Sequence, residues 1–231
     1  MPEEKRFDLT TGGGFKEGFA STLRAYFTLT PYTGSEDLYN QQTEIQQIKN
    51  PAAEFFYTAV RKQAWKLAKE DGKYPEAIAM VKTNLDNLKD QGFDSHDNRA
   101  ITIFFLRRLG RIYEHQATFA EKDKPGNDPG RQAHFLSAAY YYMQGDIEMG
   151  IMTEYSGRIS ESLRGAGFFE PASQFDTAFW GRVVYVDKEK LEALKGKRTG
   201  NVSVAQKSGG AIMEEWLDEL PGNFEDIIQN Q

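Results

Sequence analysis

The chain has 231 residues, of which 39% are hydrophobic and 27% charged, and its formal net charge is −6. This composition is typical of a folded globular protein, and the length suits one sizeable domain with appendages. The sequence contains no cysteine, which excludes disulfides, thiol catalysis and cysteine-ligated metal centres. Because it also lacks a run of about 18 apolar residues and an apolar N-terminal segment, we expect a cytoplasmic protein with no membrane contact.

The chain divides by composition into four parts. Residues 1–14 end in three glycines and predict a flexible lead-in, whereas residues 15–195 predict a single, mainly helical domain. Residues 196–210 are rich in glycine and basic side chains and predict a flexible, basic linker. Residues 211–231 form an acidic tail with six acidic residues and no lysine or arginine, so the tail accounts for the whole net charge.

Helical patterns are clearest in residues 50–166, the core of the predicted domain. Asn50 is a favoured N-cap and Pro51 suits the first helical position, so together they predict the start of a helix. Gly72 and Gly92 are placed to end helices. The strongest helical patterns cover residues 51–71, 74–91, 95–119, 132–144 and 147–164, and weaker ones cover 15–27 and 36–49, with a turn at 28–35.

Two short segments, 72–77 and 145–150, place glycine between expected helices. They are similar to the helix–turn–helix junction of tetratricopeptide repeats, in which small residues let paired helices pack closely. The Trp, Leu-Gly and closing Pro positions of that motif are absent, so the similarity implies antiparallel helix hairpins and not membership of the family. The predicted fold is therefore all-α, a helix-hairpin bundle or a short tetratricopeptide-like solenoid.

Residues 167–195 differ from the helical core in composition. Phenylalanine is frequent there, Trp180 adds a further aromatic ring, and Pro171 interrupts any helix. Residues 183–186, Val-Val-Tyr-Val, are the strongest β-pattern in the sequence. We therefore expect a small aromatic-rich extension with at most a short β-hairpin.

Basic residues recur at helical spacing on two of the expected helices. At 100° per residue each set shares one side of its helix, so two adjacent helices would form a groove for phosphates. The basic linker offers a second, more mobile contact. The candidate polyanion or nucleic-acid contacts are Lys62, Lys66, Lys69, Arg107, Arg108, Arg111, Lys197 and Arg198. The alternative is a set of ordinary solvated surfaces, since residues 50–115 carry 11 basic and 9 acidic side chains.

The acidic tail combines an apolar stripe at helical spacing with a second apolar cluster. Amphipathic segments of this kind commonly dock as helices into a groove on a partner protein. The candidate partner-binding residues are Trp216, Leu217, Leu220, Phe224 and Ile227. The alternative is that the tail docks on its own domain, over the basic stripes.

The sequence carries no recognisable catalytic motif. The three histidines lack zinc-site spacing, no Gly-x-Ser-x-Gly elbow is present, and the N-terminal glycines lack the context of a phosphate-binding loop. We expect neither a cofactor nor a metal. The sequence favours a non-enzymatic assembly subunit, a helical scaffold that engages a partner protein through its surface and tail. The alternatives are a small helical subunit of a nucleoprotein complex and an enzyme with an unrecognised site; the patterns do not fix the oligomeric state.

Overall fold

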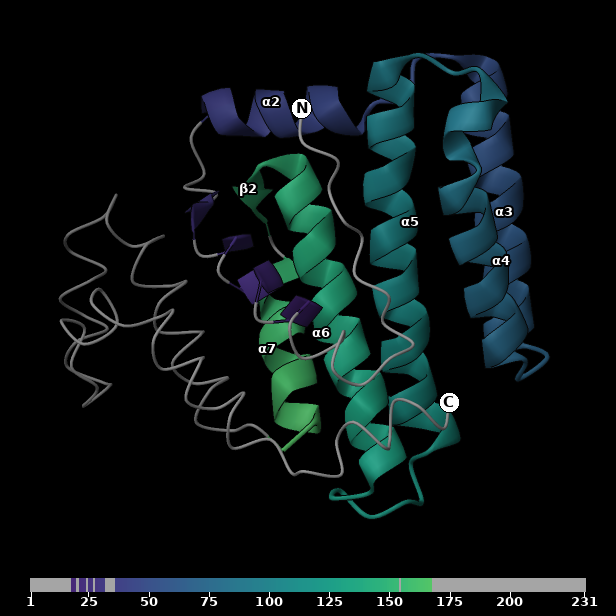
Figure 1. The fold of residues 1–231 in the computed structure, drawn as a ribbon, viewed down its shortest axis with the longest axis vertical. Coiled ribbons are helices and arrows are strands. Elements are labelled where there is room, and N and C mark those ends of the chain that lie inside the picture. Colours follow the sequence, from purple (N-terminus) through teal and green to yellow (C-terminus); the bar gives the residue numbers. More distant parts are fainter. Residues whose placement is uncertain are drawn as a thin grey trace, which may run out of the picture.

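The computed structural model describes residues 18–19, 21–23, 25–26, 28–31, 36–153 and 155–167. These residues confirm the predicted all-α class, with one short strand pair beside the helices (Figure 1). A 3-10 turn, η1 (Leu88–Gln91), follows α4, and a π-helical turn, η2 (Gln116–Ala120), follows α5. The α-helices are α2 (Glu36–Gln46), α3 (Pro51–Lys69), α4 (Tyr74–Asp86), α5 (Ser95–His115), α6 (Pro129–Met149) and α7 (Tyr155–Gly165).

The long helix α5 lies at the centre of the helical arrangement. The α3–α4 hairpin packs against one side of α5, and α6 packs against another (Figure 1). Helix α7 packs in turn on α6, while α2 crosses one end of the bundle and contacts α5. The two sides of α5 therefore have different surroundings.

The helix boundaries follow from capping residues. The side chain of Asn50 accepts a hydrogen bond of 2.9 Å from the backbone N–H of Ala52, and Pro51 occupies the first turn of α3, as predicted. Gly72 and Gly92 have φ angles of 66° and 70°. Both angles lie in the left-handed region that glycine adopts at low cost. Gly72 follows the end of α3 as predicted, whereas the helix predicted over 74–91 ends at Asp86 and Gly92 caps η1.

The predicted turn at Gly145 and Asp146 is wrong. Helix α6 continues to Met149 and ends at Gly150, whose φ is 83°. Gly145 instead allows close packing, because a Cβ atom there would lie 3.0 Å from Cγ of Arg107. Of the two segments similar to a tetratricopeptide junction, only 72–77 contains the turn of a helix hairpin, and its residues 74–77 already belong to α4.

The described strands are β1 (Thr30–Pro31) and β2 (Ile151–Met152). They pair in parallel, with Thr30 opposite Ile151 and Pro31 opposite Met152. The predicted turn at 28–35 thus includes a strand, which the sequence pattern did not show. The predicted extension beyond residue 167, with its β-pattern at 183–186, lies outside the described residues, as do the linker and the tail.

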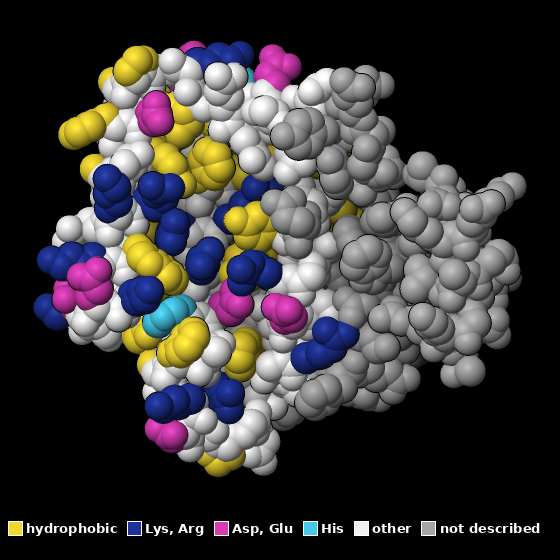
Figure 2. Space-filling model, turned by 180° about the vertical axis from the view of Figure 1, so that it is seen from behind, with side chains coloured by type: hydrophobic (Ala, Val, Ile, Leu, Met, Phe, Trp, Pro, Cys, Tyr) yellow, Lys and Arg dark blue, Asp and Glu magenta, His cyan; other side chains and the backbone are white. Residues whose placement is uncertain are grey.

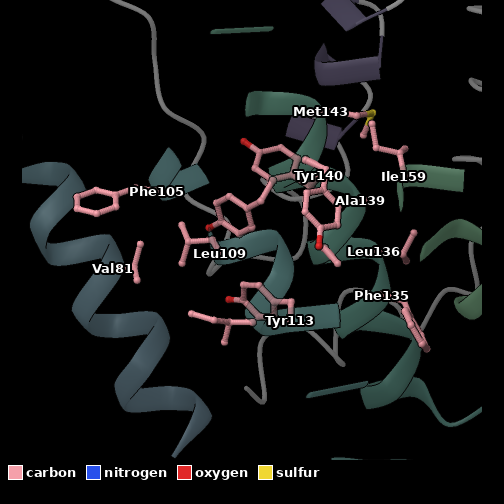
Figure 3. Packing of buried hydrophobic residues seen from close by; sticks show 14 of the residues in the cluster. Val81, Phe105, Leu109, Tyr113, Phe135, Leu136, Ala139, Tyr140, Met143 and Ile159 are labelled. Carbon is pink, nitrogen blue, oxygen red and sulfur yellow. The ribbon is translucent and has the colours of Figure 1, made fainter. Parts of the chain in front are cut away.

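One large hydrophobic cluster joins the helices. Side chains from α4, α5, α6 and α7 meet in it, among them Val81, Leu109, Tyr140 and Ile159 (Figure 3). Helix α6 is buried along most of its length because both α5 and α7 cover it. None of the described helices has the length and apolar character needed to cross a membrane.

Candidate polyanion-binding site

The structure brings most of the predicted basic residues of α3 and α5 onto one surface. Lys62, Lys66 and Lys69 are exposed on α3; on α5, Arg111 is exposed and Arg108 is half-buried. Because α3 packs beside α5, the two predicted stripes are neighbours.

Arg107 is the exception, and its assignment to a ligand-contacting stripe is wrong. Its side chain is only 6% exposed, and its guanidinium lies 3.1 Å from a carboxylate oxygen of Asp146. The same guanidinium donates a 3.1 Å hydrogen bond to the Thr153 hydroxyl and lies 4.3 Å from the ring centroid of Tyr155. Arg107 is therefore covered by the chain that connects α6 to α7.

Trp65 on α3 is the residue that links the two basic stripes. The guanidinium carbons of Arg108 and Arg111 lie 5.1 and 5.3 Å from the centroid of its ring system. Both distances suit cation–π contacts. Sequence reasoning missed Trp65, although Lys62 and Lys69 stand three and four residues away from it, the spacing that places side chains together on a helix.

Aromatic rings continue along the junction between α3 and α5. Tyr57 stacks on Phe104 with ring centroids 5.0 Å apart, and the guanidinium of Arg61 lies 5.4 Å from the Tyr57 ring. Cations and aromatic rings thus alternate on this surface. Figure 2 shows dark blue Lys and Arg side chains gathered on one face, with yellow hydrophobic side chains between them and a few magenta acidic side chains beside them.

His115 lies at the end of α5, beside the same cations. Its ring is 5.3 Å from that of Trp65, and its Nδ1 is 2.9 Å from the Tyr74 hydroxyl. Burial lowers the pKa of His115, and the charges of Lys69 and Arg111 lower it further. The imidazole is therefore mostly neutral at pH 7, held in place by its hydrogen bond.

We call this surface the α3–α5 face. It comprises Trp65, His115 and the six cations Arg61, Lys62, Lys66, Lys69, Arg108 and Arg111. Within the described part of the chain, none of these cations forms an ion pair with a carboxylate. Burial lowers the pKa of Arg108, and the charges of Arg111 and Arg61 lower it too, while Tyr57 opposes them. The face therefore concentrates six positive charges, none of which is tied to a described carboxylate in an ion pair.

Charged groups on the α6 side of α5 have partners. Arg158 lies 3.0 Å from a carboxylate oxygen of Glu114, which also accepts a hydrogen bond from the Tyr142 hydroxyl. Farther along the chain, the Glu121 carboxylate contacts both His134 and Lys124 at 2.8 Å. These pairs link elements of the bundle. Across the described residues, no group of three or more His, Cys, Asp or Glu side chains is placed to hold a metal ion.

The remaining predicted site residues lie outside the described residues. These are Lys197 and Arg198 in the linker and Trp216, Leu217, Leu220, Phe224 and Ile227 in the tail. Their roles stay predictions.

Comparison with known proteins gives no family for this chain. No protein-family model matches the sequence, and no match was found among curated proteins or solved structures.

Proposed function

We propose that this protein is a non-enzymatic helical subunit that binds a polyanion, the phosphate backbone of a nucleic acid, through its α3–α5 face. The observation that carries the proposal is that Arg108 and Arg111 both contact Trp65, while the charges of Arg61 and Lys69 lie close enough to lower the pKa of Arg108 and His115. None of the six cations of the face forms an ion pair with a described carboxylate. The proposed function thus rests on the α3–α5 face, whose residues the structure describes. Engagement of a partner protein through the acidic tail stays a prediction.

The electrostatics of the face support a ligand with several negative charges. Like charges within a Debye length of about 8 Å repel one another at physiological salt. A phosphate backbone would relieve that repulsion at several cations at once and would release its own condensed counterions. A single small anion would satisfy only part of the face.

The arrangement also differs from an ordinary solvated helix surface. On such a surface acidic side chains are interspersed with basic ones and pair with them, as Arg99 on α5 does with Glu148 on α6 at 3.9 Å. On the α3–α5 face, aromatic rings occupy the places between the cations. Alternating cations and aromatic rings are typical of surfaces that bind nucleic acid.

The proposal is tested by fluorescence anisotropy with a labelled oligonucleotide over a range of salt concentrations. If about four phosphates are contacted, log K should fall with log salt with a slope of about −3 for a single strand. Arg111→Glu should weaken binding at least about tenfold, because it removes one phosphate contact and adds a repulsive charge.

Lys89→Glu is the matched control, since Lys89 is also exposed and carries the same charge but lies on η1, away from the face. It should change binding by less than about twofold, an effect within the range of long-range screening. Equal losses in the two variants, or no binding at low salt, would refute the proposal.

A further inference from the structure

The α3–α5 face ends at an exposed aromatic ring that the backbone-binding proposal does not use. Phe119 lies in the π-helical turn η2 and is 60% exposed. Its ring centroid is 4.5 Å from that of His115, which in turn contacts Trp65. Phe119 is thus the outer member of a row of three rings, which we call the aromatic row: Trp65, His115 and Phe119.

The second strongly exposed phenylalanine shows why this placement matters. Phe55 on α3 is 77% exposed and has no ring contact among the described residues. Single exposed apolar side chains of that kind are common on protein surfaces and need no ligand to explain them. Phe119 differs because its inner face is backed by another ring and because cations lie beside it.

The aromatic row is held from both sides. The Tyr74 hydroxyl, from the start of α4, lies 2.9 Å from Nδ1 of His115 and orients the imidazole. The π turn is closed by a hydrogen bond of 3.1 Å from the N–H of Glu121 to the carbonyl of Gln116. π turns occur often at functional sites, where they displace a side chain from its α-helical position. The outer face of Phe119 is therefore a preformed, solvent-facing surface.

We propose that the α3–α5 face is specific for single-stranded nucleic acid, with an unpaired base stacked on Phe119. This inference rests on the proposed function, because the phosphates on either side of that base would be held by cations such as Lys69 and Arg111. The charges of both cations lower the pKa of His115, so the two side chains lie close to the aromatic row. Bases inside a duplex are already stacked on one another and cannot reach an exposed ring, whereas those of a single strand can.

The experiment compares three labelled probes of equal length with the full chain: oligothymidylate, the same phosphodiester chain built from abasic residues, and a hairpin duplex. Oligothymidylate should bind about 5- to 150-fold more tightly than the abasic chain, the range expected when one base stacks on an aromatic side chain. Phe119→Ala should remove most of that difference and leave binding of the abasic chain unchanged.

Phe55→Ala is the matched control, because it deletes an even more exposed ring that lies outside the aromatic row. It should bind all three probes as the unaltered chain does. Oligouridylate tests whether the strand is DNA or RNA. Similar affinity for oligouridylate and oligothymidylate would extend the site to RNA, and weaker binding of oligouridylate would restrict it to DNA. Circular dichroism checks that the two variants keep their helices.

Failure of this inference can be distinguished from failure of the proposed function. If oligothymidylate and the abasic chain bind equally, or if Phe119→Ala has no effect, stacking is refuted; binding that still depends on salt and on Arg111 keeps the backbone proposal. If polyglutamate binds as tightly as oligothymidylate, the face recognises acidic polypeptides and single-strand specificity is refuted. If no probe binds at low salt, both are refuted.

Discussion

Two sides of helix α5 use the same residue type in opposite ways. Arg107 is 6% exposed and has a carboxylate partner, Asp146, at 3.1 Å. The next residue, Arg108, is half-buried on the α3–α5 face and contacts Trp65 without any carboxylate partner. The difference between these two arginines separates a structural charge from one that is available to a ligand.

The physical reason is the cost of desolvation. A charge removed from water must be paired and hydrogen-bonded, since its solvation is lost. Asp146 is fully buried and accepts hydrogen bonds from both Arg107 and Thr153, whose backbone N–H lies 2.9 Å away. Arg111, by contrast, is exposed, so its guanidinium stays hydrated and needs no carboxylate partner. Pairing therefore marks the α6 side of α5 as structural.

The largest expected effect comes from removing a partner on the buried side. Asp146→Ala would leave the Arg107 guanidinium buried without its counter-charge, which should lower the free energy of unfolding by about 3–5 kcal/mol. Urea unfolding followed by circular dichroism measures this change. The double variant Arg107→Leu with Asp146→Leu should recover much of the loss, because no charge then remains unpaired. A loss below about 1 kcal/mol in the single variant, the typical value for an exposed pair, would contradict the structural assignment.

A smaller effect on stability is expected on the opposite side. Arg111→Gln removes an exposed charge and one cation–π contact with Trp65, worth about 0.5–1 kcal/mol at an exposed site. Relief of repulsion among the neighbouring cations offsets part of that loss. The free energy of unfolding should therefore change by less than about 1 kcal/mol in the same urea experiment, while oligonucleotide binding weakens several-fold. A large loss of stability would show that Arg111 is structural, like Arg107.

The sequence predicted helices and faces well because both depend on nearby residues. Asn50 and Gly72 mark the limits of α3 through local capping geometry. Periodicity likewise places Lys62 and Lys69 on one side of α3. Such patterns do not reveal which part of a helix another element covers. Arg107 satisfies the periodicity of the basic stripe, yet the chain around Thr153 buries it.

The other features that the sequence patterns misplaced or missed have a related origin. Gly145 resembles a turn residue, but its lack of a side chain serves close contact with Arg107. Trp65 was missed because its role depends on two arginines from another helix. The strand at Thr30–Pro31 has no β-pattern of its own, since its partner lies 121 residues away in the chain, at Ile151. Contacts between distant segments decide all three, and local patterns do not encode them.

The smallest expected effect concerns protonation of His115. Burial, Lys69 and Arg111 lower the pKa of His115 below 6.5, against a smaller opposing contribution from Glu114. The unfolded chain therefore takes up this proton at a higher pH than the folded chain. The stability contributed by neutral His115 is present above pH 6.5 and is lost as the pH falls through the folded pKa. His115→Gln should flatten this part of the pH–stability curve, which urea unfolding at several pH values would show.

Ligand binding should shift the same titration in the opposite direction. Phosphates placed near Lys69 and Arg111 would neutralise the charges that disfavour the imidazolium, so the pKa of His115 should rise when an oligonucleotide binds. By linkage, binding should then tighten as the pH falls through this range. Histidine side-chain NMR titration with and without oligothymidylate measures the shift directly. A pKa that stays the same on binding would place the phosphates away from His115 and would contradict the assignment of the backbone to this end of the α3–α5 face.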